Sequence, residues 1–308
     1  MTSPTVMHVP AMNNSRGFAQ VFLAASIILV LLIAIITRPP TSNAPTPFSA
    51  LSAAATVSSP FVYTWNSSGT VYEAGSMNQS SSPYWWVNSG AKLIIAGGVG
   101  QTVQGDLPTL DTWRTTYALS NPVDTDNGYH PQNIFRLMTR SSWDNVRVTM
   151  PFKIVRDNLS SSPNRNQSNG ILFMTRSSQD GRTVYYAGIR VDGIAVIKKK
   201  YNGSYYTMAQ KKIFDGTYSI AASSGSSQNL LPHDEWLNLR NETVTNADGS
   251  VSVRLYLQRQ GEATWTKVLE ARDSGTFGGT PPITGKRFVG VRTDFMDVLF
   301  GTFRADAL

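Results

Sequence analysis

Residues able to move a proton or hold a carboxylate occur in two strand-like stretches of this chain. His130 leads into one stretch, in which Arg136 and Arg140 fall on the same face at period two, and Tyr186 and Arg190 share a face of the other. A tyrosine or histidine can serve as acid and base, while arginine neutralises a carboxylate. If both faces line one concave sheet, they form a basic, aromatic cleft. The alternative is that the arginines are solvated and that His130 is structural.

Aromatic side chains are candidates for binding a sugar without catalysing a reaction. The sequence Tyr84-Trp85-Trp86-Val87-Asn88 places two tryptophans in succession, which point to opposite faces of a strand. We therefore expect at least one of them in the core and consider either as a platform on which a sugar ring could stack. Filling of the core by both is the alternative. Further candidate ligand-binding residues are Tyr129, Asn133, Arg140, Lys198 and Tyr206.

One acidic loop resembles the start of a calcium-binding loop. Asp124 and Asp126 present oxygens at alternate positions within Asp124-Thr125-Asp126-Asn127-Gly128, but the glutamate that closes the helical loop motif is missing. An Asx-rich turn explains the same residues. We therefore expect either no cofactor or a structural calcium ion.

Composition narrows the function classes. The 308 residues contain no cysteine, which excludes disulfides, thiolate zinc sites and a cysteine nucleophile. The net charge of +7 favours anionic partners. A basic cluster at 198–200 and 211–212 lies among Tyr201, Tyr205 and Tyr206, and we expect it to meet an anionic glycan or to be a solvated strand end. No nucleic-acid partner is expected.

The first 37 residues predict that the protein is located at a membrane. A tail of residues 1–16 precedes an uncharged apolar run at 17–37, which at about 1.5 Å rise per residue is long enough to cross a bilayer core of roughly 30 Å. The lipid bilayer is thus an expected partner through 17–37. A long cleaved signal peptide, with Ser49-Ala50-Leu51 as cleavage site, is the alternative.

A Pro, Ser, Thr and Ala-rich linker at 38–60 then leads to one domain at 61–308. We expect a single-pass membrane protein with this domain outside the cytoplasm, at a cell surface or in a periplasm. Six Asn-x-Ser/Thr sequons occur, but a cysteine-free ectodomain is more typical of bacteria, so we do not expect glycosylation.

Beyond Phe61 the apolar residues recur at period two. Val146, Val148, Met150, Phe152 and Ile154 alternate with polar residues or proline, as in a strand with one buried face. Similar candidates occupy 170–176, 184–191, 194–200, 205–208, 236–244, 251–258, 289–293 and 297–303, with tight-turn sequences such as Asn202-Gly203 between some of them. About ten to fourteen strands with almost no helical periodicity predict an all-β, two-sheet antiparallel sandwich.

These strands also carry a family resemblance. The runs Gly170-Ile171-Leu172-Phe173 and Tyr185-Tyr186-Ala187-Gly188-Ile189-Arg190, followed by Asp192-Gly193 and a lysine-rich strand, resemble the middle strands of concanavalin A-like lectin/glucanase jelly rolls. Gly290-Val291-Arg292-Thr293-Asp294 and the strand after it resemble the last strands of laminin G-like and keto-disaccharide-hydrolase-like members. The resemblance covers residues 60–308 and implies a jelly-roll domain.

That resemblance implies a polysaccharide as partner but leaves the activity open, because the fold hosts binding modules, hydrolases and lyases. The Glu-x-Asp-x-Glu strand of laminarinase-like members is missing, so their retaining chemistry is not expected. We expect a membrane-anchored carbohydrate-binding domain for polysaccharide, including anionic polysaccharide or cell-surface glycan. A polysaccharide lyase or glycoside hydrolase using His130, Tyr186, Arg136 and Arg190 is one alternative, and a structural or protein-interaction domain is another.

Overall fold

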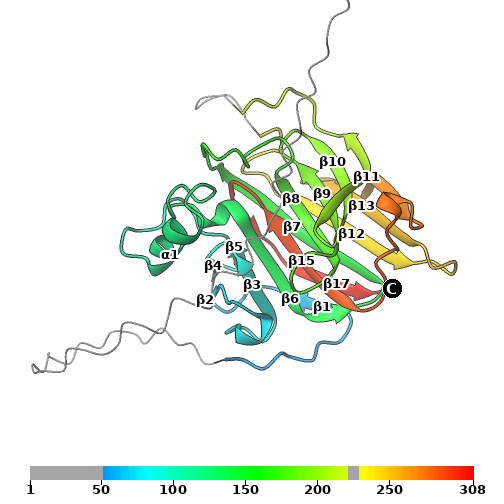
Figure 1. The fold of residues 1–308 in the computed structure, drawn as a ribbon, viewed down its shortest axis with the longest axis horizontal. Helices are drawn as coiled ribbons and strands as arrows, with labels where there is room; N and C mark the ends of the chain where they lie inside the picture. Colours follow the sequence, from blue (N-terminus) through cyan, green and yellow to red (C-terminus); the bar gives the residue numbers. More distant parts are fainter. Residues whose placement is uncertain (1–50, 221–228) are drawn as a thin grey trace, which may run out of the picture. The chain divides into compact units, whose positions relative to one another are not determined.

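Two antiparallel sheets form the domain in the computed structural model, which describes residues 51–220 and 229–308 (Figure 1). The larger sheet has the strand order β14-β13-β12-β7-β16-β5-β4-β2, and β17 pairs with both β7 and β1. Its strands are β1 (Phe61–Tyr63), β2 (Gly69–Tyr72), β4 (Lys92–Ala96), β5 (Val99–Gln101), β7 (Val146–Asp157), β12 (Leu237–Thr245), β13 (Val251–Arg259), β14 (Thr266–Asp273), β16 (Met296–Phe300) and β17 (Phe303–Ala307).

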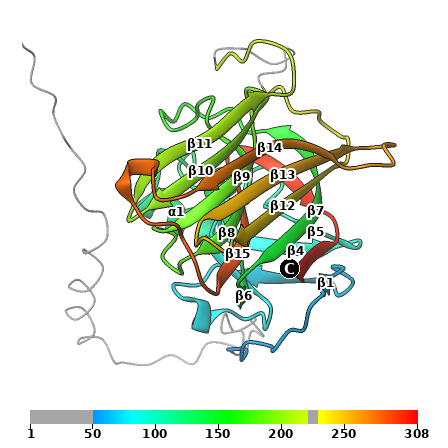
Figure 2. The same ribbon diagram turned by 90° about the vertical axis from the view of Figure 1, so that its right-hand side faces the viewer.

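The second sheet has seven strands in the order β11-β10-β9-β8-β15-β6-β3. They are β3 (Trp85–Ser89), β6 (Phe135–Trp143), β8 (Gly170–Ser177), β9 (Val184–Arg190), β10 (Ile194–Tyr201), β11 (Ser204–Lys212) and β15 (Arg287–Thr293). Short helical turns are η1 (Met77–Gln79), η2 (Pro131–Ile134) and η3 (Phe277–Gly279), beside the helix α1 (Thr112–Ser120). Figure 2 shows β12, β13 and β14 side by side in the larger sheet and β10 beside β11 in the smaller one. The predicted two-sheet antiparallel jelly-roll sandwich is confirmed.

Alternation along the strands fills the space between the sheets. In β7 every second residue from Val146 to Ile154 is buried, as predicted. Met150, Phe152 and Leu239 of the larger sheet meet Phe173 and Val291 of the smaller sheet. Removing these apolar side chains from water is the main favourable term in the stability of such a sandwich.

Local turn chemistry sets the strand pairs. Asn202 and Gly203 both have positive φ, 49° and 94°, as the predicted tight hairpin between β10 and β11 requires. The predicted strand at 297–303 is instead two strands, β16 and β17, which are separated at Gly301 and Thr302. At this break the backbone nitrogen of Gly301 donates a hydrogen bond of 2.9 Å to the carbonyl of Pro151 in β7. Pro151 has no backbone N–H, so it cannot donate a ladder hydrogen bond in return.

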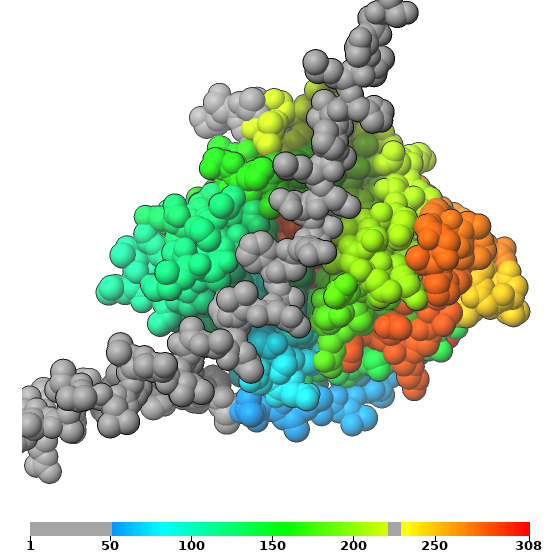
Figure 3. Space-filling model, in the orientation of Figure 1, coloured from blue at the N-terminus to red at the C-terminus, as the bar shows by residue number. Residues whose placement is uncertain are grey.

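A helical excursion was not predicted from the sequence. The side chain of Asp111 caps α1 by accepting a hydrogen bond of 2.9 Å from the nitrogen of Trp113. Tyr117 is the buried residue of the helix, so α1 shows little of the periodicity that sequence analysis detects. Residues around α1 project to the left of the sheets in Figures 1 and 3.

The predicted transmembrane segment at 17–37 lies outside the described residues. Within 51–220 and 229–308, no helix is both long enough and apolar enough to cross a membrane. The last ten residues of the predicted linker pack as part of the domain: Ser52 donates to the carbonyl of Ser80 at 3.3 Å, and Ala55 to that of Pro83 at 2.9 Å. Arg140 donates to the carbonyl of Ser52 at 2.6 Å. Residues 51–60 are therefore attached to the domain.

The lysine-rich strand β10 contains one lysine that points inward. Lys199 and Asp273 are fully buried and form an ion pair of 2.7 Å. Lys199 also donates to the carbonyls of Thr280 and Pro281, both at 2.8 Å, and Tyr185 donates to Asp273 at 2.5 Å. Burial, followed by the bond to Asp273, raises the pKa of Tyr185. The interpretation of this cluster as a solvated strand end is therefore wrong for Lys199.

The substitution Lys199→Met is expected to lower the free energy of unfolding by about 3–5 kcal/mol, because it leaves the buried carboxylate of Asp273 without its counter-charge. Chemical denaturation measures the change. Lys211→Met on the exposed end of the neighbouring strand is the matched control and should change stability by less than about 0.5 kcal/mol. A loss below about 1 kcal/mol in Lys199→Met would show that the pair does not stabilise the fold.

Candidate functional site

Strand register places two rows of side chains on the outer face of the seven-stranded sheet. In the first row, partners across neighbouring strands are Lys198, Tyr186, Met174, Gly290, Met138 and Trp86. The second row, two residues along each strand, contains Arg136, Arg292, Leu172, Gly188 and Val196. Residues two apart share a face, so both rows point away from the core between the sheets.

Two tyrosines, Tyr186 of β9 and Tyr205 of β11, stack on this face toward the β11 edge of the sheet. The rings of Tyr186 and Tyr205 stack with centroids 6.1 Å apart and an interplanar angle of 21°. Tyr186 is buried, whereas Tyr205 is 50% exposed and covers it. Lys200, the register partner of Tyr205, holds its Nζ 5.0 Å from the ring centroid. The exposed ring is thus an aromatic surface beside a cation.

Cations surround the tyrosine pair. We call the set Arg136, Tyr186, Arg190, Lys198, Tyr205 and Arg292 the basic face. Arg292 donates from Nε to Asp294 at 2.8 Å, while Arg190 is paired with Asp192 and donates to the carbonyl of Gln167 at 3.0 Å.

The two remaining cations of the basic face lack such partners. Neither Arg136 nor Lys198 forms a direct ion pair in the described part of the chain, and the buried Nε of Arg136 has no hydrogen-bond partner there. Glu73 and Asp294 act on Arg136 and Lys198, respectively, through longer-range electrostatic attraction. A charged or polar group that is removed from water without a partner costs free energy, which an anionic ligand at this place would offset.

The surroundings shift the pKa values of the two stacked tyrosines in opposite directions. Burial raises the pKa of Tyr186, although Arg292 and Arg136 act against it. For Tyr205 partial burial also acts to raise the pKa, but Arg292, Lys200 and Arg136 outweigh it and hold the pKa below the ordinary value of 10.0. The pKa of Lys198 is lowered by burial first and then by Arg190 and Arg292. The face therefore carries a concentrated positive field.

The structure brings together only some of the predicted catalytic residues. Arg136, Tyr186 and Arg190 share the outer face, as predicted. His130 does not join them through any described interaction: its Nδ1 lies 2.8 Å from Asp126 and its Nε2 lies 2.8 Å from Asp106. With both ring nitrogens held by carboxylates, His130 has no free nitrogen for a substrate.

Both predicted tryptophan platforms are buried, which corrects that expectation. Trp85 belongs to the core between the sheets, and Trp86 faces the opposite side, as its place in the strand requires. Trp86 is only 4% exposed because it packs with Met77 and Ala74 and donates from Nε1 to the carbonyl of Ala74 at 2.8 Å. Neither ring is available for stacking on a sugar.

Several other predicted ligand residues have structural partners. Arg140 donates to the carbonyls of Ser52 and Ser82, and Asn133 is fully buried and donates to Asp126 at 3.1 Å and to the carbonyl of Asp124 at 2.8 Å. The guanidinium of Arg114 covers the ring of Tyr129 at 3.6 Å. The ring of Tyr206 lies against Gly278, away from Tyr186. Lys198 alone of this predicted set lies on the basic face.

The predicted calcium ligands hold a loop together through hydrogen bonds. Asp124 accepts from Ser162 at 2.6 Å and from Asn164 at 2.9 Å, and these bonds lower its pKa although partial burial acts to raise it. Asp126 accepts from Ser160 at 2.6 Å as well as from Asn133. Among the described residues, no group of three or more His, Asp or Glu side chains is arranged to hold a metal ion.

Sequence reasoning selected Tyr206 as a ligand residue, whereas Tyr205 is the ring that stacks on Tyr186 in the basic face, and it assigned no role to Arg292. A signal for Tyr205 exists in the hairpin: a two-residue turn at Asn202-Gly203 pairs Tyr201 with Ser204 and therefore Lys200 with Tyr205. That register puts Tyr205 on the face of Lys200. Arg292 carries no comparable local signal, because its neighbours Arg136 and Leu172 come from strands far away in the sequence.

No family model matches the sequence, and no curated protein matches it. Similar solved structures include the carbohydrate-binding module CBM66 from Bacillus subtilis, at 12% identity over 72% of this chain and 95% of that chain, with a TM-score of 0.44. They include the β-glucanase of Bacillus licheniformis, at 10% identity over 82% and 100% of the two chains, with a TM-score of 0.42. They also include the exoplasmic/lumenal domain of VIP36, at 10% identity over 74% and 87%, with a TM-score of 0.42.

These likenesses concern the fold alone. The strand order and register described above establish the sandwich from this chain itself. The two-sheet antiparallel sandwich that the sequence predicts is therefore present.

Titration of Tyr205 tests the electrostatics of the basic face. We expect tyrosinate absorbance to begin to rise below the ordinary pKa of 10.0, and this earliest step should be absent in Tyr205→Phe. In Lys200→Gln the step should move to higher pH, because a neutral side chain no longer favours the phenolate. Tyr72→Phe, an exposed tyrosine of β2, serves as the control and should leave the step in place. An unchanged early step in Tyr205→Phe would contradict the assignment.

Proposed function

We propose that the domain binds an anionic polysaccharide, carrying carboxylate or sulfate groups, on the basic face. The observation that carries this proposal is the presence of two cations without an ion pair in the described residues, Arg136 and Lys198, beside the stacked rings of Tyr186 and Tyr205. A sugar ring can lie against the exposed tyrosine while its acidic group meets a cation.

Charge supports this class of ligand over a neutral one at this place. Arg292 and Arg190 are already paired with Asp294 and Asp192, which neutralise their charge and hold their guanidinium groups in place. The unpaired cations are then left for the ligand. Lys200 beside Tyr205 extends the positive surface to the edge of the sheet formed by β11.

We further propose that this binding occurs outside the cytoplasm, with residues 17–37 as the anchor in a bilayer. The support is the apolar run of 21 uncharged residues in the sequence. The bound polymer would then be a cell-surface or environmental glycan.

An eliminating lyase is the second function that a specific observation favours. The cations around Tyr205 lower its pKa, which makes its phenolate a better-populated base at neutral pH. Such a base would take the proton α to a uronate carboxylate, and the electron pair of that C–H bond would form the C4–C5 double bond as the C4–O bond breaks. The phenol of Tyr205 would then return the proton to the leaving oxygen, which gives an unsaturated uronate and a free sugar hydroxyl. Arg136 could neutralise the carboxylate during this step. In this version Tyr205 replaces His130 as the proton acceptor.

Binding to polyuronates and sulfated glycans tests the proposal. The double variant Arg136→Gln/Lys198→Gln should bind at least about tenfold more weakly, because each charged hydrogen bond contributes roughly 1.5–3 kcal/mol. Calorimetry or biolayer interferometry gives the affinity. The affinity of the unaltered protein should fall as salt is added, as for any interaction between exposed charges.

The matched control is Lys211→Gln/Lys286→Gln, which removes the same charge from exposed lysines outside the basic face. It should bind like the unaltered protein. Melting temperatures of all variants exclude loss of fold as the cause. Equal affinity in both double variants would refute the assignment of the face, and absorbance from unsaturated product would establish the lyase.

A further inference from the structure

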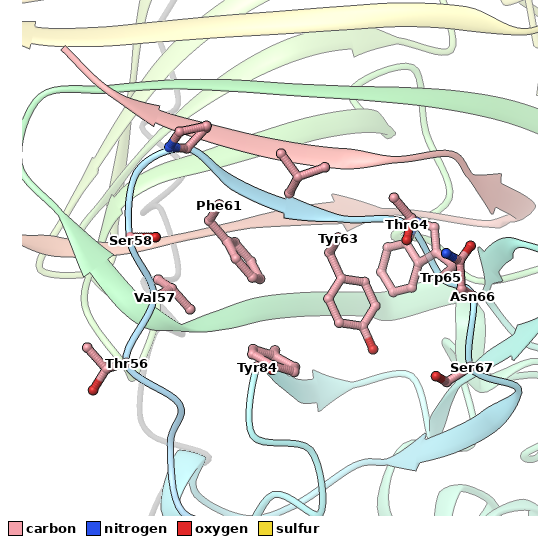
Figure 4. Close-up of a pocket in the computed structure, with 12 residues that line it drawn as sticks. Thr56, Val57, Ser58, Phe61, Tyr63, Thr64, Trp65, Asn66, Ser67 and Tyr84 are labelled. Atoms are coloured by element: carbon pink, nitrogen blue, oxygen red, sulfur yellow. The ribbon is translucent and has the colours of Figure 1, made fainter.

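A separate groove lies beside β1, away from the residues of the basic face. It has a volume of about 440 Å³ and is lined by residues 56–58, residues 60–67 and Tyr84. Figure 4 shows residues 56–58 on one side, residues 64–67 on the other, and Phe61, Tyr63 and Tyr84 between them. The volume falls within the range of ordinary small-ligand sites, roughly 300–1,000 Å³.

The lining of this groove contains no charged side chain. Its polar groups are hydroxyls and one amide, contributed by residues such as Thr56, Ser58, Asn66 and Ser67. An ion entering it would lose water and meet no counter-charge, which is unfavourable. The groove therefore suits a neutral, hydroxyl-rich ligand, in contrast to the basic face.

Aromatic rings form a fixed floor. The rings of Tyr63 and Tyr84 meet edge to face with centroids 5.5 Å apart, and Phe61 stacks on Tyr84 at 5.8 Å. Tyr63 is also held edge-on by Trp65 at 4.8 Å and by Trp85 at 5.4 Å. Because these contacts fix the two tyrosine rings without a ligand, little conformational entropy is left to lose on binding.

Trp65 fixes the position of the neighbouring wall. Its indole Nε1 donates to the carbonyl of Gly301 at 2.6 Å, which ties residues 64–67 to the break between β16 and β17. The buried Trp65 thus anchors this side of the groove to the core, while the side chains of Thr64, Asn66 and Ser67 remain exposed.

Polar atoms around the floor are free to bind. In the described part of the chain the hydroxyls of Tyr63 and Tyr84 have no hydrogen-bond partner, and the same holds for the side chains of Asn66 and Ser67. Each is half-buried or exposed, so water satisfies it at present. A ligand with several hydroxyls can replace that water at each position, which an apolar ligand cannot do.

We propose that this groove is a binding site for a neutral sugar residue, whose apolar ring face contacts Tyr63 and Tyr84 and whose hydroxyls bond Asn66, Ser67 and the tyrosine hydroxyls. The aromatic floor and the uncharged polar rim are the two components that recognise a neutral pyranose. The site is independent of the proposed anionic-glycan function, since the two surfaces share no residue. Together they would let one domain contact a neutral and an acidic glycan.

The test uses the full chain in a detergent without a sugar headgroup, made in a host that does not glycosylate Asn66. Neutral gluco-, manno- and xylo-oligosaccharides are titrated into it and followed by calorimetry. Binding is expected for at least one of the three series. The double variant Tyr63→Phe/Tyr84→Phe keeps both rings and removes both hydroxyls, and it should weaken that binding by about tenfold or more.

Asn66→Ala/Ser67→Ala provides a second variant at exposed positions that should not affect folding, and it should weaken binding similarly. Tyr72→Phe, an exposed tyrosine of β2, is the control and should bind unchanged. Absence of binding in all three series would overturn the proposal, as would unchanged affinity in both groove variants. The double variant Arg136→Gln/Lys198→Gln separates this proposal from the anionic-glycan proposal. It alters only the basic face, so its affinity for neutral oligosaccharides should be unchanged.

Discussion

Cross-strand register in the seven-stranded sheet is the constraint on which the basic face depends. Since side chains alternate at period two, pairing Lys198 with Tyr186 and Arg292 with Arg136 sends all four to the same side. A slip of one residue between β9 and β10 would bring Lys199 outward and send Lys198 into the core. The buried pair of Lys199 with Asp273 opposes that slip, because it would leave a carboxylate without its cation. The inner ion pair and the outer cations are thus two results of one register.

Pairing within the outer face then divides its charges into two kinds. Arg190 and Arg292 each have an aspartate two residues along the chain, in Arg190-Val191-Asp192 and Arg292-Thr293-Asp294, and these local pairs position the guanidinium groups. Arg136 and Lys198 have no such neighbour. The groove beside β1 differs again, since its lining has hydroxyls, an amide and aromatic rings but no charge. The domain therefore presents two surfaces of different chemistry on one sandwich.

The fold was predictable to the extent that it follows from local alternation. Val146 to Ile154 in β7 and the Asn202-Gly203 hairpin carry their own structural signal, and both were predicted correctly. α1 was missed because Tyr117 is its one buried residue, so no apolar stripe marks it. The burial of Trp86 and the capture of His130 depend on partners distant in sequence: Trp86 bonds Ala74, 12 residues away, and His130 bonds Asp106, 24 residues away. The sequence grouped Arg136, Tyr186 and Arg190 on one possible face, but it did not place Arg292 beside them, because that position is set by pairing with strands distant in the sequence.

The attachment of residues 51–55 has a mechanical consequence. Ser52 and Ala55 bond the loop before β3, and Arg140 of β6 grips the carbonyls of Ser52 and Ser82 together. A pull on the chain from its N-terminal side is thus borne first by these few contacts at the β3–β6 edge, ahead of β1 and its pairing with β17. Tension would peel a short segment from the margin of the sheet before it reached the strands β8 to β11. Tyr186, Arg190, Lys198 and Tyr205 lie on β9 to β11, toward the opposite margin, whereas Arg136 lies on β6, at the margin that bears the load.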